Sequence, residues 1–467
     1  MALGSGAVDR GAAGVMSEPR FSNGSGAYRL AWDSPELLTL EFERLDVTRR
    51  EFTATIRATS TAPGASGLLH QERLNLESGI SRDRFAARLA KRTPGTGVDW
   101  DGLIRDACLK VLESYRAGDP AIFLRDVTAP PGAGWLLPPL ALTRHPVIVY
   151  GDGGTLKSFL LLAAGIDIHS GSHLLGLEAG ARLRVGYLDA EFDGWEHRER
   201  MRRLVGESMP EVVYIRSVGP IRDQIERLRR IIRDQELGFL LLDSIGFMCD
   251  GPPEEAASAL AFYDAVRQLN IGTLGAAHSN RTGDTEKPFG SVFWHNGARS
   301  TWYVKKQQEV GGDQVTVGLF NKKSNVGRLA PPLGYRFSFE GERILIDRTD
   351  VRDVRELAGQ VSLKDRMSHA LRAGALAYTD LAEVLEADVE SVSRIARRYE
   401  GKLFTLLPGS GGKKRVGLAD FPRPDTVRPD TPDTVLPSEH QGRTDTPLPK
   451  GVSGPPVRPV ATQEANR

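Results

Sequence analysis

Alternation of apolar and polar residues marks the start of the folded chain. The segments LTLEF (38–42) and FTATIRA (52–58) place an apolar residue at every second position, which is typical of half-buried strands. Apolar residues at helical spacing then follow Ser81 and Asp99, each of which can cap a helix. We expect an N-terminal α+β segment over residues 27–140, to which the sequence assigns no role. The Gly-, Ala- and Ser-rich residues 1–26 are predicted to be a disordered leader.

Short apolar runs alternate with amphipathic stretches over residues 141–350. The runs are VIVY (147–150), RVGYLD (184–189), VVYIR (212–216), FLLLD (239–243) and TLGAAH (273–278). Apolar, β-rich runs separated by helical patterns indicate a parallel sheet that is covered on both faces. The last segments of this region look like added antiparallel strands: STWYVKKQ (300–307), QVTVGLFNKK (314–323) and GYRFSFEGERILID (334–347).

Residues 361–419 have the order helix, helix, turn, helix and two strands around a Gly-rich turn, which matches a winged helix-turn-helix. Three arginines lie on one face of the expected recognition helix, and three basic residues lie in the expected wing; these are Arg394, Arg397, Arg398, Lys413, Lys414 and Arg415. Both sets suit contact with DNA phosphates. Four acidic residues precede this helix, so docking to a protein is the alternative; they are Glu383, Glu386, Asp388 and Glu390. Residues 420–467 read as a disordered, Pro-rich tail.

A glycine-rich turn joins the first apolar run to a helix. It satisfies GxxxxGK[ST] except at the second glycine, where Leu156 stands; the predicted nucleotide-binding residues are Gly151, Asp152, Gly153, Gly154, Thr155, Leu156, Lys157 and Ser158. Backbone amides would surround phosphate, Lys157 would reach the β- and γ-phosphates, and Ser158 would bind Mg²⁺. A positive φ at Leu156 would cost about 1–3 kcal/mol, whereas a negative φ would cost little. The alternative is a strand-to-helix turn without a ligand.

Polar side chains end three of the other apolar runs. Asp243 ends FLLLD, where a carboxylate can hold Mg²⁺ through water, although a helix cap is the other interpretation. Asp189, Glu191 and Asp193 follow the run 184–189, and Glu191 is our candidate for orienting or deprotonating the attacking water; a solvated acidic turn is the alternative. His278 ends the run 273–278 and can sense the γ-phosphate, because ligands of such sheets lie at the strand carboxyl ends.

The polar loop between His278 and Trp302 is long enough to be functional. Arg299 or Arg281 is predicted to act as an arginine finger toward the nucleotide of a neighbouring subunit. The alternative for either residue is a surface arginine in a loop.

The composition indicates a cellular compartment but does not indicate a binding partner. The 61 Lys+Arg and 60 Asp+Glu residues leave a net charge of +1, so a nucleic-acid partner has to be argued locally. The two cysteines form no CxxC or His-paired motif, which argues against a disulfide framework or zinc site and favours a reducing cytoplasm. No apolar run approaches the roughly 20 residues of a membrane span, so we expect a protein of the cytoplasm.

Taken together, YLDAE (187–191), LLLDS (240–244) and AAHSNR (276–281) resemble the RecA-like core of RepA-type hexameric helicases and AAA-family ATPases over about residues 145–330. The resemblance implies an α/β fold, a RecA-like P-loop NTPase core with a parallel sheet, here between the N-terminal α+β segment and the winged helix-turn-helix. It also implies ATP and Mg²⁺ as cofactors. By this likeness Lys157 and Ser158 bind phosphate and Mg²⁺, Glu191 is the catalytic carboxylate, Asp243 the Walker B acid and His278 the sensor.

The sequence departs from this family at Leu156 and at Phe289, which precedes Gly290 where the family has an Arg-Gly start. The favoured function is an ATPase motor or remodeller in plasmid- or phage-type DNA replication. We expect it to assemble as a homo-oligomer, for which a hexamer is the candidate. The first alternative is an ATP-switched DNA-binding regulator with slow or no hydrolysis. The second is a structural DNA-binding protein with a degenerate loop.

Overall fold

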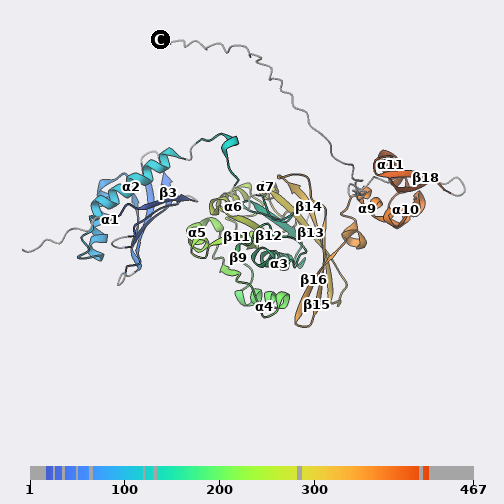
Figure 1. Cartoon of the computed structure of the whole chain (residues 1–467), viewed down its shortest axis with the longest axis horizontal. Helices are drawn as coiled ribbons and strands as arrows, with labels where there is room; N and C mark the ends of the chain where they lie inside the picture. The colour runs from blue at the N-terminus through green and yellow to red at the C-terminus, as the bar shows by residue number, and fades with distance from the viewer. Residues whose placement is uncertain are drawn as a thin grey trace, which may run out of the picture.

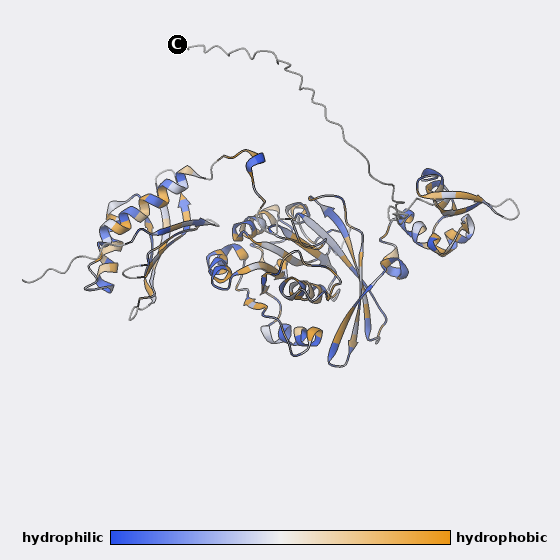
Figure 2. Cartoon of the chain, viewed as in Figure 1, coloured by the Kyte–Doolittle hydropathy of each residue, from blue (hydrophilic) through white to orange (hydrophobic). Residues whose placement is uncertain are grey.

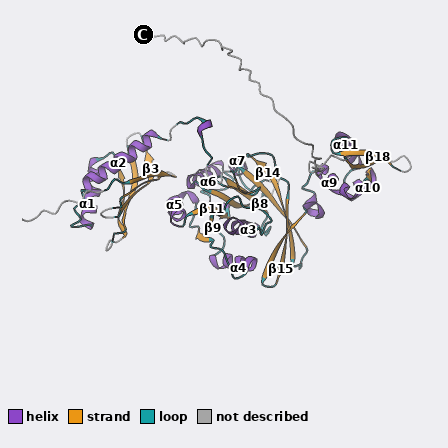
Figure 3. Ribbon diagram, viewed as in Figure 1, coloured by secondary structure: helices purple, strands orange, loops and turns teal. Residues whose placement is uncertain are grey.

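The described residues of this computed structural model form an N-terminal, a central and a C-terminal unit (Figure 1). They are residues 17–24, 27–33, 37–48, 51–62, 67–118, 121–129, 134–280, 287–409 and 414–419. Most of the expected leader and all of the expected tail lie outside them, as do Arg281 and Lys413. Figure 3 shows how helices accompany a sheet in each unit.

The N-terminal unit packs two helices on an antiparallel sheet. The sheet order is β1-β2-β3-β4-β5, with β1 (Arg20–Gly24), β2 (Ala27–Ala31), β3 (Leu38–Val47), β4 (Phe52–Ser60) and β5 (Gly67–Asn75). The helices are α1 (Gly79–Arg92) and α2 (Trp100–Ala117), and both show a hydrophobic and a hydrophilic side in Figure 2. The alternating residues predicted for β3 and β4 form one core with the inner sides of these helices.

Two predicted boundaries of this unit were wrong. The folded chain begins with β1 at Arg20, inside the expected leader, because β1 is a mostly exposed edge strand and carries no apolar alternation. Helix α1 begins at Gly79 after Ser78, whose side chain accepts a hydrogen bond from the Ser81 backbone N–H. Asp99 caps α2 as predicted, accepting from the Gly102 N–H.

Buried acidic residues of β3 contact α5 (Ile225–Asp234) of the central unit. Arg230 Nη1 donates to both carboxylate oxygens of Glu43 at 2.9 and 3.0 Å, and Arg233 Nη1 donates to Glu41 at 2.6 Å. Because Glu41 and Glu43 are each more than nine-tenths buried, removing either arginine would leave a buried carboxylate with a weaker counter-charge, which is strongly destabilising.

The central unit contains a mixed sheet in the order β10-β9-β11-β12-β8-β13-β14-β15-β16. Its strands are β8 (Pro146–Gly151), β9 (Arg184–Asp189), β10 (Val213–Arg216), β11 (Leu237–Asp243), β12 (Gly272–His278), β13 (Ser300–Gln308), β14 (Gln314–Ser324), β15 (Leu333–Glu340) and β16 (Arg343–Thr349). Its other helices are α3 (Lys157–Ser170), α4 (Gly194–Val205), α6 (Ala256–Leu269) and α7 (Val292–Gly297), with short 3₁₀ turns at Ile221–Gln224 and Ile245–Met248.

Successive residues of β8 face different cores, which explains its unbroken apolar run. Val147 and Val149 pack in the core that contains α3, whereas Ile148 and Tyr150 pack in the core that contains α5 and α6. Strands β10, β9, β11, β12, β8 and β13 run parallel to one another. The expected parallel sheet covered on both faces is therefore present, and its carboxyl edge is where a ligand site is expected.

Two features of the central unit differ from the prediction. β13 was expected to be antiparallel, but it runs parallel to β8, and only its contact with β14 is antiparallel. The unit also begins before residue 141, since the hairpin of β6 (Trp135–Leu137) and β7 (Ala141–Leu142) packs into the core with α3. Strands this short, separated by Pro138 and Pro139, carry too few residues for a periodic pattern.

The C-terminal unit combines short helices with an antiparallel sheet in the order β17-β19-β18. Its elements are α9 (Leu363–Ala370), β17 (Leu376–Ala377), α10 (Tyr378–Val384), α11 (Val389–Arg398), β18 (Phe404–Pro408) and β19 (Lys414–Leu418). The short helix α8 (Arg355–Ala358) precedes them and packs through Leu357 into the core of the central unit. A 3₁₀ turn at Val351–Asp353 follows β16, and another at Leu371–Ala373 follows α9. A 3₁₀ turn at Leu124–Asp126 lies earlier in the chain, between α2 and β6. None of the helices in the described part of the chain is both long and apolar enough to cross a membrane.

Candidate functional site

The glycine-rich turn lies between β8 and α3, at the carboxyl edge of the parallel strands. Gly151 ends β8 where a side chain cannot fit, because a Cβ there would lie 2.3 Å from the Val304 carbonyl oxygen. Gly154 has a φ of +71°, which a residue with a side chain rarely adopts. The backbone therefore needs glycine at both positions, and the loop leads directly into the N-terminus of a helix that begins at Lys157.

Leu156 has φ 59° and ψ 25°, the left-handed conformation that glycine adopts most readily. The loop has thus kept this geometry although a leucine occupies the position. Left-handed backbone costs a non-glycine residue about 1–2 kcal/mol. The Leu156 side chain packs against the core beside α3, and this contact offsets part of the strain.

Lys157 is almost buried, with 8% of its surface exposed. Its Nζ donates to the carbonyl oxygens of Gly151 at 2.9 Å and Asp152 at 2.8 Å, so the ammonium lies over the loop. Burial lowers the pKa of Lys157 below its usual value, and nearby carboxylates, Asp243 first, oppose the shift. The lysine is positioned to exchange these carbonyl contacts for phosphate oxygens, which would also favour its charged form.

Asp243 and Glu191 extend from the carboxyl ends of neighbouring strands. Asp243 ends β11 next to Asp189 of β9, is 2% exposed, and accepts a 2.6 Å hydrogen bond from Tyr187 Oη. Glu191 accepts a hydrogen bond from the Ser244 hydroxyl, and its Oε1 lies 3.8 Å from Nε2 of His278. Three strands therefore bring together the two carboxylates and the histidine that the sequence singled out.

The two other acidic residues near Glu191 have structural positions. Asp189 is fully buried and accepts hydrogen bonds from the backbone N–H groups of Glu191 and Phe192, which fixes the turn that carries Glu191. Asp193 caps α4 by accepting from the Glu196 N–H at 3.0 Å. The acidic turn given above as the alternative therefore applies to Asp193, which caps the helix.

These groups surround a cavity of about 270 Å³. Its lining combines the glycine-rich turn with the strand-end side chains: Gly153, Gly154, Thr155, Leu156, Lys157, Ser158, Phe159, Glu191, Phe192, Arg200, Asp243, Ser244 and His278. Asp152 lies beside the cavity and accepts a hydrogen bond from Ser279 Oγ. Ser158 and Asp243 both line it, and hydroxyl and carboxylate oxygens are the ligands that Mg²⁺ prefers.

Arg200 of α4 is a cavity residue that the sequence analysis missed. Its guanidinium carbon lies 4.5 Å from the centre of the Phe192 ring and 5.2 Å from that of Phe159. Nε lies 3.3 Å from a carboxylate oxygen of Glu196 without hydrogen-bond geometry, and buried Nε and Nη1 have no hydrogen-bond acceptor among the described residues. A largely buried guanidinium that contacts two aromatic rings, with unused donors beside the phosphate loop, suits an anionic ligand.

No local pattern in the sequence marks Arg200. It is one of several basic residues in WEHRERMRRL (195–204), and only the folding of α4 over the loop distinguishes it from the exposed Arg198. Tyr187 and Ser244 were missed for a related reason, since their roles depend on the pairing of β9 with β11.

Arg299 lies away from this cavity. It precedes β13, and its N–H donates to the carbonyl oxygen of Pro146 at the start of β8, the edge opposite the phosphate loop. There it lines a separate cavity of about 590 Å³ with His145 and Asn325. Arg299 therefore cannot contact the nucleotide site of its own chain, and a role toward a neighbouring subunit stays a prediction.

Known proteins were compared with this chain by family model, by sequence and by structure. Residues 115–284, which are 170 of the 467 residues, match the family model of the AAA domain. A KaiC-like protein of Pyrococcus horikoshii covers 47% of this chain and 99% of its own, with 13% identity and a TM-score of 0.34. The flagellar accessory protein FlaH of Methanocaldococcus jannaschii covers 44% of this chain and 91% of its own, with 15% identity and a TM-score of 0.32. No curated protein matches the sequence.

The match to the AAA-domain model and the phosphate loop together support a P-loop ATPase domain in the central unit. The two structural likenesses are too low in TM-score to add to this argument.

Proposed function

We propose that the central unit binds and hydrolyses MgATP and that the protein uses this reaction to act on DNA as a RepA-type helicase or remodeller. The observation that carries the proposal is the convergence of Lys157, Glu191 and Asp243 on one cavity, from α3, from the turn after β9 and from the end of β11. Walker-type ATPases need a phosphate-binding lysine, a magnesium carboxylate and a carboxylate for the water.

Each group has a defined task in this reaction. The loop amides and Lys157 bind the β- and γ-phosphates. Ser158 and Asp243 are the residues that would hold Mg²⁺, whose positive charge would offset the negative charge of the phosphate oxygens. Glu191 orients the attacking water and accepts its proton, and the Ser244 hydroxyl holds the Glu191 carboxylate in place. His278, 3.8 Å from Glu191, senses whether the γ-phosphate is present.

Arg200 adds a positive charge at the same cavity. Its unused donors point to a phosphate oxygen as the missing acceptor, and a cation there would stabilise the charge that develops during phosphoryl transfer. Phe159 and Phe192 both contact the guanidinium group and limit its contact with water.

DNA binding is assigned to the C-terminal unit, interpreted as a winged helix. Arg394, Arg397 and Arg398 of α11 are exposed, and their spacing puts them on one face of that helix. Cations in this arrangement suit contact with DNA phosphates. The assembly is a homo-oligomer in which Arg299 of one subunit approaches the nucleotide of the next.

ATP turnover measured with and without single-stranded DNA tests the proposal. We expect DNA to stimulate turnover by the wild type, and Lys157→Ala and Glu191→Gln to lower turnover by at least about 100-fold, the size of effect seen when a key transition-state contact is lost. Asp193→Asn is the matched control, because this acidic residue caps α4 outside the cavity.

Slow ATP turnover that DNA does not stimulate would contradict the motor function and support an ATP-switched regulator. A wild-type protein that neither binds nor hydrolyses ATP would overturn both functions.

A further inference from the structure

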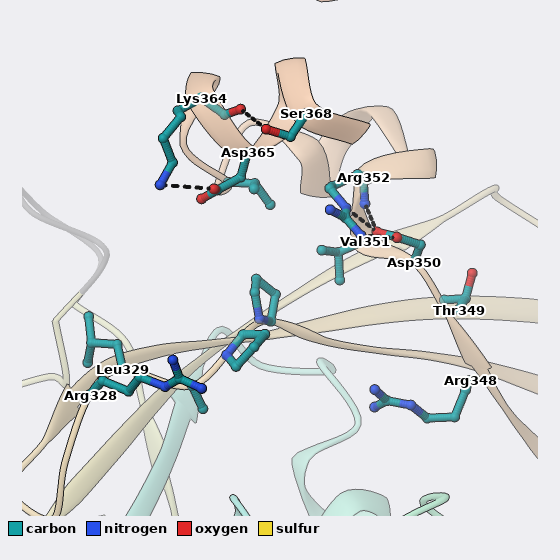
Figure 4. Close-up of a pocket in the computed structure, with 14 residues that line it drawn as sticks. Arg328, Leu329, Arg348, Thr349, Asp350, Val351, Arg352, Lys364, Asp365 and Ser368 are labelled. Atoms are coloured by element: carbon teal, nitrogen blue, oxygen red, sulfur yellow. Dashed lines mark hydrogen bonds and ion pairs between the residues drawn. The ribbon is translucent and has the colours of Figure 1, made fainter. Parts of the chain in front are cut away.

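A second cavity, of about 890 Å³, lies where the central and C-terminal units meet. Figure 4 shows its lining, which comes from the segment after β14, from the end of β16 and the turn that follows, and from α9. It shares no lining residue with the nucleotide cavity. Nothing in the proposed ATPase reaction uses this place.

The lining of this junction cavity is rich in positive charge. It contains four cations and two carboxylates, a net of +2; they are Arg328, Arg348, Arg352, Lys364, Asp350 and Asp365. Asp350 accepts from Arg352 Nε at 2.8 Å, and Lys364 Nζ lies 3.3 Å from Asp365. These two cations are therefore partly neutralised within the cavity wall.

Arg328 and Arg348 are different, because neither forms an ion pair with a carboxylate of the described residues. Figure 4 shows their side chains extending toward each other from opposite sides of the cavity. Arg348 lies over the ring of Tyr335, with its guanidinium carbon 4.9 Å from the ring centre, which holds its direction. Two guanidinium groups that face one cavity without counter-ions favour an anionic ligand.

The junction cavity is linked to the arginine face of α11 through Tyr399. Lys364 Nζ lies 5.6 Å from the centre of the Tyr399 ring, and the guanidinium carbon of Arg398 lies 5.7 Å from the same centre. A row of cations therefore leads from Arg398, past a half-buried aromatic ring, to Lys364 and into the cavity. Cations spread along a row fit a linear polyanion better than a compact one.

We propose that the junction cavity binds the phosphodiester backbone of single-stranded DNA, which continues there from α11. This site depends on the proposed function, because that function assigns DNA contact to α11. A single strand is the form that fits, because duplex DNA is stiff over about 50 nm and cannot bend into a recess between two units. Pro331, Pro332 and Val361 give the cavity an apolar wall against which bases can lie.

Fluorescence anisotropy of a labelled single-stranded oligothymidylate, titrated with the full chain, tests the site. We expect Arg328→Ala/Arg348→Ala to weaken binding at least tenfold and to reduce the slope of log K against log salt by about 1.4, since each single-strand phosphate contact contributes about 0.7. ATP turnover without DNA stays at the wild-type level. The lysine pair Arg328→Lys/Arg348→Lys keeps the charge and should retain most of the affinity, which separates lost charge from a folding defect.

Arg336→Ala/Arg343→Ala is the matched control, because both arginines are exposed on β15 and β16 but lie outside the cavity lining. If the cavity variant binds as tightly as this control while Arg394→Ala/Arg397→Ala/Arg398→Ala loses binding, the junction site is overturned and the proposed function stands. If the wild type does not bind the oligonucleotide, the DNA part of the proposed function fails together with the site. Poly-glutamate could also bind as tightly as the oligothymidylate and lose as much affinity in Arg328→Ala/Arg348→Ala. This result would indicate an acidic polypeptide as the ligand and would also overturn the proposal.

Discussion

The hydroxyl of Tyr187 donates a 2.6 Å hydrogen bond to Oδ2 of Asp243. The tyrosine lies on β9 and the aspartate ends β11, so the contact depends on the parallel pairing of these two strands. The two residues are 56 positions apart in the sequence. Burial, together with the negative charge of Asp243, raises the pKa of Tyr187 well above its usual value. The hydroxyl therefore keeps its proton and holds one carboxylate oxygen, which leaves the other for the magnesium site.

Replacing Tyr187 with Phe tests this support. The change removes a buried hydrogen bond to a charged group, so we expect the free energy of unfolding to fall by about 1.5–3 kcal/mol. We also expect half-maximal ATP turnover to need several-fold more Mg²⁺, because Asp243 loses its fixed orientation. Urea denaturation and a magnesium titration measure the two effects. An unchanged magnesium requirement would contradict the assignment of Asp243 to the metal.

The left-handed backbone of Leu156 predicts an unusual order of stability between two variants. Leu156→Gly and Leu156→Ala both lose the packing that the leucine side chain makes beyond Cβ, but only glycine adopts this φ without strain. At an ordinary helix position glycine is less stable than alanine by about 1 kcal/mol. Here we expect glycine to be the more stable by about 1 kcal/mol, measured by denaturant unfolding. Alanine as the more stable variant would show that the loop adopts a negative φ.

Arg200 is predicted to serve the nucleotide rather than the fold. Arg200→Met keeps the contact with Phe159 and Phe192 but removes the charge, so we expect turnover to fall by about 10²-fold or more, with a melting temperature equal to or above that of the wild type. Arg198→Met, on the exposed side of the same helix, is the control and should leave turnover unchanged. A large loss of stability in Arg200→Met would indicate a structural arginine.

The lowered pKa of Lys157 predicts a pH dependence of nucleotide binding. Only the ammonium form attracts phosphate, so ADP affinity should weaken as the pH rises through a pKa that lies below the ordinary lysine value of 10.5. Lys157→Arg binds less tightly but keeps its charge, because guanidinium does not deprotonate in this range. Calorimetric titrations from neutral to alkaline pH should show the loss of affinity in the wild type and not in this variant. The same alkaline loss in both proteins would assign the titration to another group.

The apolar pattern predicted much of this molecule because secondary structure depends on local periodicity. The strand from Pro146 to Gly151, its glycine-rich turn and the helix from Lys157 were visible in the sequence. Because parallel strands end at one edge of a sheet, the sequence also indicated that Glu191, Asp243 and His278 could meet there. The edge strand β1 and the short β6–β7 hairpin were not predictable, since a few residues carry no period.

Tertiary structure decided what depends on strand order and on contacts between distant segments. The parallel pairing of β13 with β8 places Arg299 at the edge opposite the phosphate loop, and the packing of α4 brings Arg200 to the cavity. Neither position follows from residues that are close in sequence. The φ of Leu156 was open for the same reason: a single side chain is compatible with two backbone conformations, and the core into which it packs, with the helix that follows, selects the strained one.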